Sequence, residues 1–190
     1  LMDSLDKCKD RITAHVNYHE QACAMAACGW AEITGLPGVA YATSGPGATN
    51  LLTGIACAYF ESLPCLFVTG QVNTYEQKGS LGVRQKGFQE TDIVSIARPV
   101  TKMAVMVESA EKLPEILEAA YRTAMEGRRG PVLVDIPMDV FRGEVLGKPG
   151  APELPRADGA RAGKAAGEIL RQLQSAKRPV ILAGHGISLA

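Results

Sequence analysis

Residues 38–72, GVAYATSGPGATNLLTGIACAYFESLPCLFVTGQV, decide the fold because two kinds of segment alternate within them. Continuous apolar stretches at 39–43 and 65–69 predict strands that are buried on both faces. The longer stretch 46–61 between them predicts a helix. A strand, a helix and a second strand in this order form the unit from which parallel sheets are built. We therefore expect an α/β fold, with a parallel sheet covered by helices on both faces.

The same alternation extends to both sides of this stretch. Apolar, β-branched runs predict further strands at 13–18, 103–107 and 131–136, and further helices are predicted near 20–34, 90–97 and 110–126. The last helix follows Ser109, its expected N-cap, and carries one apolar stripe at helical spacing. The stripe consists of Leu113, Ile116, Leu117, Ala120, Tyr121 and Ala124.

The chain has 190 residues, 46% of them hydrophobic, which suffices for one domain with a core and part of a second. Residues 1–141 are expected to form the first domain, with its first strand missing. Residues 142–159 are rich in proline, glycine and charge and predict a linker. Residues 160–190 predict the truncated start of a central α/β domain, with a helix at 160–174 and a strand in RPVILAGHGI. We expect a fragment of a longer protein.

The charge speaks against nucleic acid and membrane partners, and the cysteine content indicates the redox compartment. Twenty basic and twenty acidic residues give no net charge, so nothing attracts nucleic acid or an anionic membrane. The five cysteines, at positions 8, 23, 28, 57 and 65, show no CxxC pair and are expected to be free thiols in a reducing compartment. Without a signal peptide or a membrane-span run, the expected location is the cytoplasm.

The turn SGPGATN, residues 44–50, stands between a predicted strand and a predicted helix. Its glycines relax the backbone, and the first helical turn offers N–H groups to an anion or a polar ring. A plain turn explains the same residues. The turn departs from GxGxxG at Asn50 and lacks the lysine of a P-loop, which speaks against both nucleotide fingerprints.

Glu20, in HEQ, lies where a predicted strand meets a predicted helix of small residues. One interpretation is a first-turn carboxylate that offsets the helix dipole, worth ~0.3–1 kcal/mol. The other is an acid with a raised pKa that shares a proton with a ring nitrogen. Its expected apolar wall consists of Ala22, Cys23, Ala26, Ala27 and Trp30.

Three other segments contain residues that can carry chemistry. His15 and His19 would lie about 13 Å apart on a strand, too far for one metal ion. The segment GFQETD, residues 87–92, follows a loop at 71–86 that is long enough to fold over a site, although a solvated loop explains it equally. Arg128 and Arg129 fit cations near a helix C-terminus.

Taken in order, YHEQACAMAACGWAEITG, residues 38–72, GFQETDIVSIARPVTK and GRRGPVLVDIPMDV resemble the N-terminal, pyrimidine-binding domain of thiamine-diphosphate enzymes of the acetolactate synthase group. The likeness runs from about residue 15 to 141, and residues 160–190 are similar to the start of that group's central domain. It implies that the full-length protein is a thiamine-diphosphate-dependent carboligase or decarboxylase, a transferase or lyase acting on pyruvate or another 2-keto acid.

The resemblance also assigns roles to residues. Glu20 falls at the glutamate that hydrogen-bonds N1′ of the aminopyrimidine and promotes the tautomer that deprotonates thiazolium C2. Phe88 and Gln89 fall at a pair that faces the reacting carbons, and Lys102 falls near the substrate channel. Arg128 falls at the arginine that contacts FAD in flavin-bearing members. The residues expected against the pyrimidine are Thr43, Ser44, Gly45, Pro46, Gly47 and Asn50.

The resemblance further implies that Mg²⁺ and the diphosphate are held by a domain absent from this chain, so the fragment alone is expected to be inactive. A homodimer or tetramer is expected to form through the apolar face at 44–59. The longer loop between Gln71 and Phe88 leaves the substrate open. The alternatives are a noncatalytic or split-subunit scaffold that complements another chain, and an unrelated nucleotide-binding module.

Overall fold

The computed structural model describes residues 2–145, 159–184 and 186. The chain divides into two compact units, Leu1–Glu153 and Leu154–Ala190, which are treated separately. Most of the predicted linker, residues 146–158, lies outside the described residues, so the linker stays a prediction.

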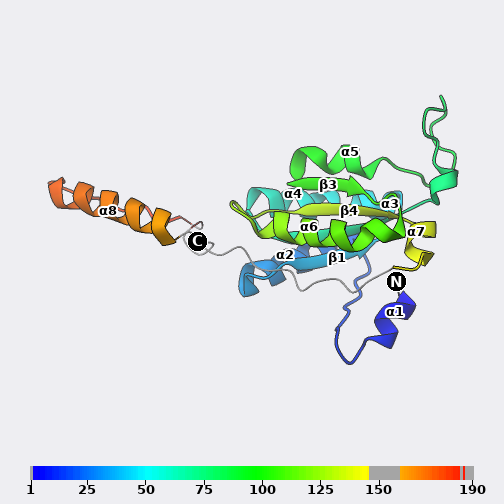
Figure 1. Ribbon diagram of the computed structural model, residues 1–190, viewed down its shortest axis with the longest axis horizontal. Helices are drawn as coiled ribbons and strands as arrows, with labels where there is room; N and C mark the ends of the chain where they lie inside the picture. Colours follow the sequence, from blue (N-terminus) through cyan, green and yellow to red (C-terminus); the bar gives the residue numbers. More distant parts are fainter. Residues whose placement is uncertain (1, 146–158, 185, 187–190) are drawn as a thin grey trace. The chain divides into compact units, whose positions relative to one another are not determined.

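Four parallel strands form the sheet of the first unit (Figure 1). They are β1 (Gly38–Ala42), β2 (Cys65–Gln71), β3 (Met103–Met106) and β4 (Val132–Pro137), in the order β1-β2-β4-β3. The pairings place Ala42 beside Thr69, and Thr69 beside Asp135. All carboxyl ends therefore meet at one edge of the sheet. The fold class is confirmed, as are four of the five predicted strands.

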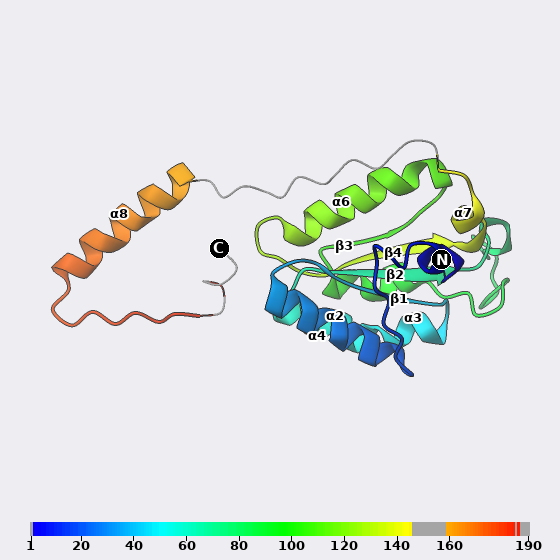
Figure 2. The same cartoon turned by 90° about the horizontal axis from the view of Figure 1, so that it is seen from below.

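Helices cover both faces of this sheet (Figure 2). One layer contains α2 (Glu20–Thr34), α4 (Leu52–Phe60) and α5 (Ile93–Ala97); the other contains α6 (Leu113–Met125) and α7 (Met138–Arg142). The remaining elements of this unit are α1 (Met2–Lys7), α3 (Pro46–Asn50) and the 3₁₀ turns Thr74–Glu76, Arg98–Val100 and Ala110–Lys112. The predicted stripe of α6 packs inward, with Ala120 and Ala124 fully buried.

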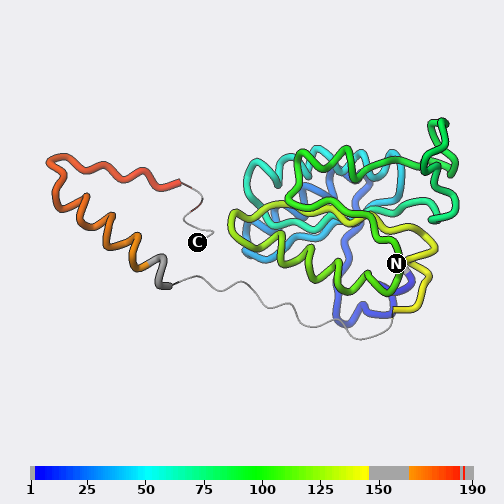
Figure 3. Tube along the Cα trace, turned by 45° about the horizontal axis from the view of Figure 1, so that its top comes forward, coloured from blue at the N-terminus to red at the C-terminus, as the bar shows by residue number. Residues whose placement is uncertain are grey.

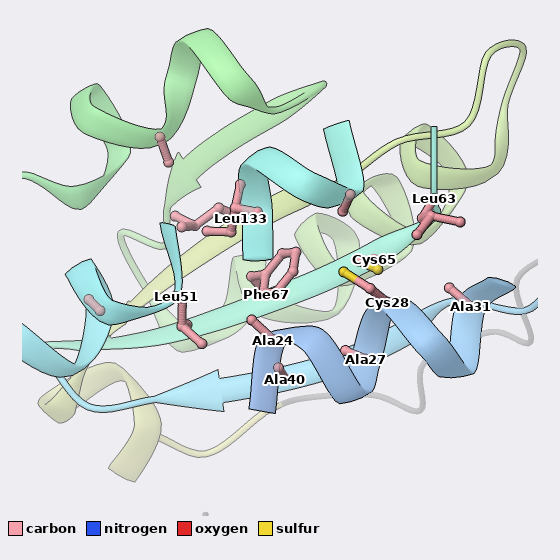
Figure 4. Close-up of a cluster of buried hydrophobic side chains, with 14 of the residues drawn as sticks. Ala24, Ala27, Cys28, Ala31, Ala40, Leu51, Leu63, Cys65, Phe67 and Leu133 are labelled. Atoms are coloured by element: carbon pink, nitrogen blue, oxygen red, sulfur yellow. The ribbon is translucent and has the colours of Figure 1, made fainter. Parts of the chain in front are cut away.

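The small residues of α2 serve close packing against β1 and α4. Ala24, Ala27 and Cys28 pack into a core with Leu51 and Phe67 (Figure 4). A Cβ atom on Gly54 of α4 would lie 2.2 Å from the Cβ of Ala24, closer than any real contact. The alanines and cysteines therefore let helix and sheet backbones approach where larger side chains would clash.

Several predicted elements are wrong or displaced. Residues 12–17 form no strand and are exposed, because a strand needs a paired neighbour and none of the described residues pairs with them. The helix predicted at 46–61 is interrupted at Leu51, whose N–H donates to the Ala48 carbonyl in a tight turn. Ser109 precedes a 3₁₀ turn and makes no side-chain cap, so α6 begins at Leu113.

The second unit contains α8 (Gly159–Ser175), which exposes Ile169 and Leu170. The strand predicted in RPVILAGHGI is wrong for residues 179–184, which are exposed and have no regular structure. The start of a second domain stays a prediction. Among the described helices of both units, none combines the length and the apolar character that crossing a bilayer requires.

A buried polar cluster interrupts the core at the carboxyl ends of β2 and β4. The Asp135 carboxylate is 1% exposed and accepts hydrogen bonds from Thr69 Oγ1 at 2.7 Å and from Gln71 Nε2 at 3.0 Å. Burial raises the pKa of Asp135 from about 3.8 to about 6, although both hydrogen bonds oppose the shift. Its ionised form is therefore disfavoured by folding.

Because of this carboxyl group, we expect the free energy of unfolding to depend on pH, and we expect Asp135→Asn to remove that dependence. Because the pKa of Asp135 is higher in the folded protein than in the unfolded chain, its contribution to stability is fully present at a pH below the unfolded pKa. This contribution is lost as the pH rises through about 6. Relative to the variant, the wild type should lose roughly 2.5 kcal/mol of unfolding free energy between pH 4 and 7. Urea unfolding of both proteins across this range measures the difference. A difference that stays constant with pH would contradict the prediction.

Candidate active site

Most of the predicted site residues gather at the edge of the sheet where the strands end; Lys102 and Arg128 do not. Glu20 is the first residue of α2, and His19 caps this helix because its Nδ1 accepts a hydrogen bond from the Gln21 N–H at 3.1 Å. This cap explains the histidine beside Glu20 without a metal ion. Across the ranges that the structure describes, no group of three or more His, Cys, Asp or Glu side chains is placed to hold a metal.

The Glu20 carboxylate is held by Asn50, the last residue of α3. Asn50 Nδ2 donates to Glu20 Oε2 at 3.0 Å, joining residues thirty positions apart. This hydrogen bond is the main reason why the pKa of Glu20 lies below its usual value. The predicted raised pKa is therefore wrong for this chain by itself. The expected apolar wall does not form, because Ala22, Ala26 and Trp30 are exposed.

The glycine turn leaves room for this carboxylate. A Cβ atom on Gly47 would lie 3.3 Å from Glu20 Oε1 and 2.8 Å from Thr43 Cγ2. Only a residue without a side chain leaves that space open between Glu20 and Thr43. Ser44 is half-buried, and Pro46 begins α3, as a proline at a helix start should.

The GFQETD segment packs against the same turn. Gly45 has a φ of 61°, and a Cβ atom there would lie 2.6 Å from Gln89 Cβ. Gln89 itself has a φ of 60°, an uncommon conformation for a residue with a side chain. Phe88 beside it is 80% exposed. The structure thus brings Glu20, Thr43, Gly45, Gly47, Asn50 and Gln89 together.

Lys102 and Arg128 lie at the opposite edge of the sheet, because they precede β3 and β4 respectively. Lys102 Nζ donates to the carbonyls of Thr123 and Glu126 at the end of α6. Arg128 Nε donates to Ser62 Oγ at 2.8 Å. The structure does not bring these two residues to Glu20, so their predicted roles stay predictions.

The long loop after β2 projects from the end of the sheet beside the site (Figure 3). Glu90 joins two points of this loop, because its carboxylate oxygens accept hydrogen bonds from the N–H groups of Lys78 and Lys86, both at 2.8 Å. Sequence reasoning missed this function of Glu90. Its position directly after Phe88 and Gln89 was the available signal.

A cavity of about 420 Å³ borders the turn, and Thr43 belongs to its lining. The other residues around it are Asp3, Tyr41, Ala42, Val68, Gly70 and Phe141. The cavity therefore extends from the carboxyl ends of β1 and β2 toward α7.

Comparisons with known proteins show the family of this chain. Residues 1–96 match the family model described as "Thiamine pyrophosphate enzyme, N-terminal TPP binding domain". The acetolactate synthase of Arthrospira platensis is 41% identical over 90% of this chain and 30% of its own length. The acetolactate synthase large subunit of Lactococcus lactis is 41% identical over 90% of this chain and 29% of its own.

The acetolactate synthase isozyme 2 large subunit of Escherichia coli K12 is 48% identical over 64% of this chain and 21% of its own length. The chain spans about 30% of the length of the first two of these relatives. The family match covers residues 20–50, which supply the carboxylate, the glycine turn and Asn50. The chain therefore belongs to the thiamine pyrophosphate enzymes and carries their N-terminal cofactor-binding domain.

Proposed function

We propose that the full-length protein is a thiamine-diphosphate-dependent carboligase or decarboxylase of acetolactate synthase type that acts on pyruvate or another 2-keto acid. The observation that carries the proposal is the Glu20 carboxylate, held by Asn50 above the space left by Gly47. The names of the relatives support the same reaction class.

The residues present fit an aminopyrimidine ring. Glu20 Oε1 is not used by Asn50, which bonds Oε2, and it faces the space that a side chain at position 47 would fill. A flat ring with a basic nitrogen can approach a carboxylate across glycine, whereas a Cβ atom would block it. In this proposal Thr43, Ser44, Gly45, Pro46 and Gly47 line the ring site.

The residues of the chain divide the work between them. When bound, thiamine diphosphate supplies an acidic carbon that adds to a ketone carbonyl once it is deprotonated. Glu20 holds or shares a proton at Oε1, and Asn50 fixes the carboxylate so that this oxygen points to the ring site. Phe88 and Gln89 stand at the rim, where they would orient the substrate.

The lowered pKa makes Glu20 a carboxylate while the site is open. Covering it with a second protein surface removes water and favours its protonated form. We therefore propose that the acid–base function is completed when another domain closes over Glu20.

Other parts of the cofactor site are assigned to the rest of the protein. We propose that Mg²⁺ and the diphosphate are bound by a domain outside this chain. FAD binding at Arg128 stays a proposal; this arginine is exposed and already donates to Ser62. A cytoplasmic location likewise stays a proposal.

An exposed apolar surface supports subunit association. Trp30 and Ile33 of α2 are 58% and 88% exposed, and Phe60 at the end of α4 is 68% exposed. Large apolar side chains grouped on one helix layer are typical of a protein interface. The apolar face predicted at 44–59 is largely buried in the core, where Leu51, Ile55 and Ala58 are fully buried. We therefore propose a homodimer or tetramer through this layer, in which the active site forms between the N-terminal domain of one subunit and another domain of its neighbour.

The test is product analysis with the full-length protein. Pyruvate is supplied alone, with a second 2-keto acid, or with an aldehyde, each with and without thiamine diphosphate and Mg²⁺. Release of carbon dioxide and a new carbon–carbon bond that depend on both additions would support the proposal. No turnover of any 2-keto acid by protein that binds the cofactor would refute it and favour the noncatalytic scaffold.

Gly45→Ala is expected to weaken thiamine diphosphate binding by about tenfold or more. The new Cβ would sit at a φ of 61° and 2.6 Å from Gln89 Cβ, so the turn and the GFQETD segment must separate. Titration of the full-length protein with cofactor measures the effect. Gly79→Ala, which also has a positive φ but nothing within 4 Å, is the control for backbone strain alone. Equal affinity in the two variants would contradict the explanation.

A further inference from the structure

The side-chain amide of Gln71 has its orientation fixed by three hydrogen bonds. Its Nε2 donates to Asp135 Oδ2 at 3.0 Å and to the Thr91 carbonyl at 2.7 Å, while its Oε1 accepts from the Val72 N–H at 3.0 Å. Turning the amide over would place its oxygen against two acceptors and its NH₂ against a donor. Because Asp135 presents an acceptor oxygen to Nε2, it favours this orientation of the amide.

This buried amide reaches the candidate active site through a short stretch of backbone. Thr91 is two residues from Gln89, and its hydroxyl lies 3.4 Å from the Gln89 carbonyl. Gln89 has a left-handed backbone, which costs about 1 kcal/mol or more unless its surroundings hold it. Gly45 meets Gln89 on one side, and the Thr91 carbonyl is tied to the sheet on the other.

Neither Gln71 nor Asp135 is available to substrate, because they are 8% and 1% exposed. Buried polar groups with every hydrogen bond satisfied hold their neighbours in one arrangement. Asp135 is also the centre of the cluster, since Thr69 donates to its other oxygen at 2.7 Å. The cluster thus connects the rigid ends of β2 and β4 to the loop that carries Gln89.

We propose that Gln71 and Asp135 are positioning residues for the reaction: Asp135 orients the Gln71 amide, which holds the Thr91 carbonyl and thereby keeps Gln89 against the glycine turn. This inference rests on the proposed function for its effect on turnover. Its effect on the loop does not depend on that function and can be measured separately.

The test uses Gln71→Met in the full-length protein, which keeps the length of the side chain and removes both donors. The kcat with the keto acid should fall by about 10- to 100-fold, as expected for a small misplacement of a group at the reacting centre. Affinity for thiamine diphosphate should change by less than about threefold, because Glu20 and the glycine turn keep their contacts. Amide hydrogen exchange in residues 87–92 should become faster.

Two further variants complete the experiment. Asp135→Asn still presents an oxygen to Gln71 and an N–H to the Thr69 hydroxyl, so it should keep kcat within about threefold of the wild type. Asp139→Asn is the matched control, because Asp139 accepts from the Thr74 N–H at 3.0 Å and contacts the start of the loop instead. Its kcat and its exchange in 87–92 should match the wild type.

The outcomes separate the possible failures. If amide exchange in residues 87–92 is the same in Gln71→Met as in the wild type, the inference is overturned. A wild type without activity would refute only the proposed function, and the exchange experiment would still decide the inference. A kcat of Gln71→Met equal to that of the wild type also overturns the inference. So does a loss of kcat that is no larger than the loss of folded, cofactor-binding protein. Should Gln71→Met not fold, Gln71→Asn, too short to span Asp135 and Thr91, is judged by the same measurements. A loss in Asp135→Asn as large as that in Gln71→Met overturns the part assigned to Asp135.

Discussion

Replacing Glu20 with alanine in the full-length enzyme is expected to slow proton exchange at C2 of the bound thiazolium by about 10²- to 10⁴-fold, the range typical of lost acid–base catalysis. Glu20 is the carboxylate that lies over Gly47, and Asn50 holds it there. Without it, the ring site keeps its shape but has no group that shares a proton with the ring.

The variant Glu20→Gln removes the acidic group of this side chain but keeps its size and shape. The amide oxygen still accepts the hydrogen bond from Asn50, so the local geometry is kept, but no proton can be released. Exchange should therefore fall about as far as in Glu20→Ala. Exchange of the thiazolium proton for deuterium, followed by NMR after acid quench of the loaded enzyme, gives the rate.

The matched control for both variants is Glu32→Gln, since Glu32 lies exposed on the same helix. It should exchange at the wild-type rate. A Glu20→Ala enzyme that binds the cofactor and exchanges as fast as the wild type would remove the central element of the proposed function.

Gly38→Ala should destabilise the first unit by roughly 4 kcal/mol or more, which is enough to unfold a typical domain. A Cβ atom on Gly38 would lie 1.9 Å from the Ala27 carbonyl oxygen and 2.6 Å from its carbon. These atoms belong to the backbone of α2, so no side-chain rotation relieves the clash. The helix must move off β1 and open the core around Phe67.

Gly29→Ala is the control for this prediction, because Gly29 lies within α2 and nothing lies within 4 Å of its Cβ position. There the substitution should stabilise the helix by about 0.5–1 kcal/mol. Urea unfolding followed by circular dichroism compares the variants. A midpoint for Gly38→Ala near that of the wild type would mean that helix and sheet are packed less closely than described.

Local pattern predicted the sheet well and the N-terminal segment poorly, for a physical reason. The four correct strands are apolar runs whose burial follows from their own residues. Residues 13–18, TAHVNY, mix apolar with polar residues, and a strand also requires a neighbour to pair with, about which local sequence says nothing. The interruption at Leu51 likewise depends on a turn that helical periodicity does not register.

The candidate site was only partly predictable. The resemblance identified Glu20, the glycine turn and Gln89, which the structure brings together. Of the two interpretations of Glu20, the one with a raised pKa is wrong for this chain by itself, because the decisive hydrogen bond comes from Asn50, thirty residues away. The functions of Gln71 and Asp135 were not predicted, because these polar residues lie in mainly apolar strands and their partners come from other segments of the chain.

The position of β1 has a practical consequence. Among the described strands β1 pairs only with β2, so it forms one edge of the sheet, and Val39 on it is 61% exposed. An exposed strand at a sheet edge can pair with strands of neighbouring molecules. Handled as an isolated piece, the chain is thus prone to edge-to-edge aggregation at high concentration, a process distinct from assembly through α2 and α4.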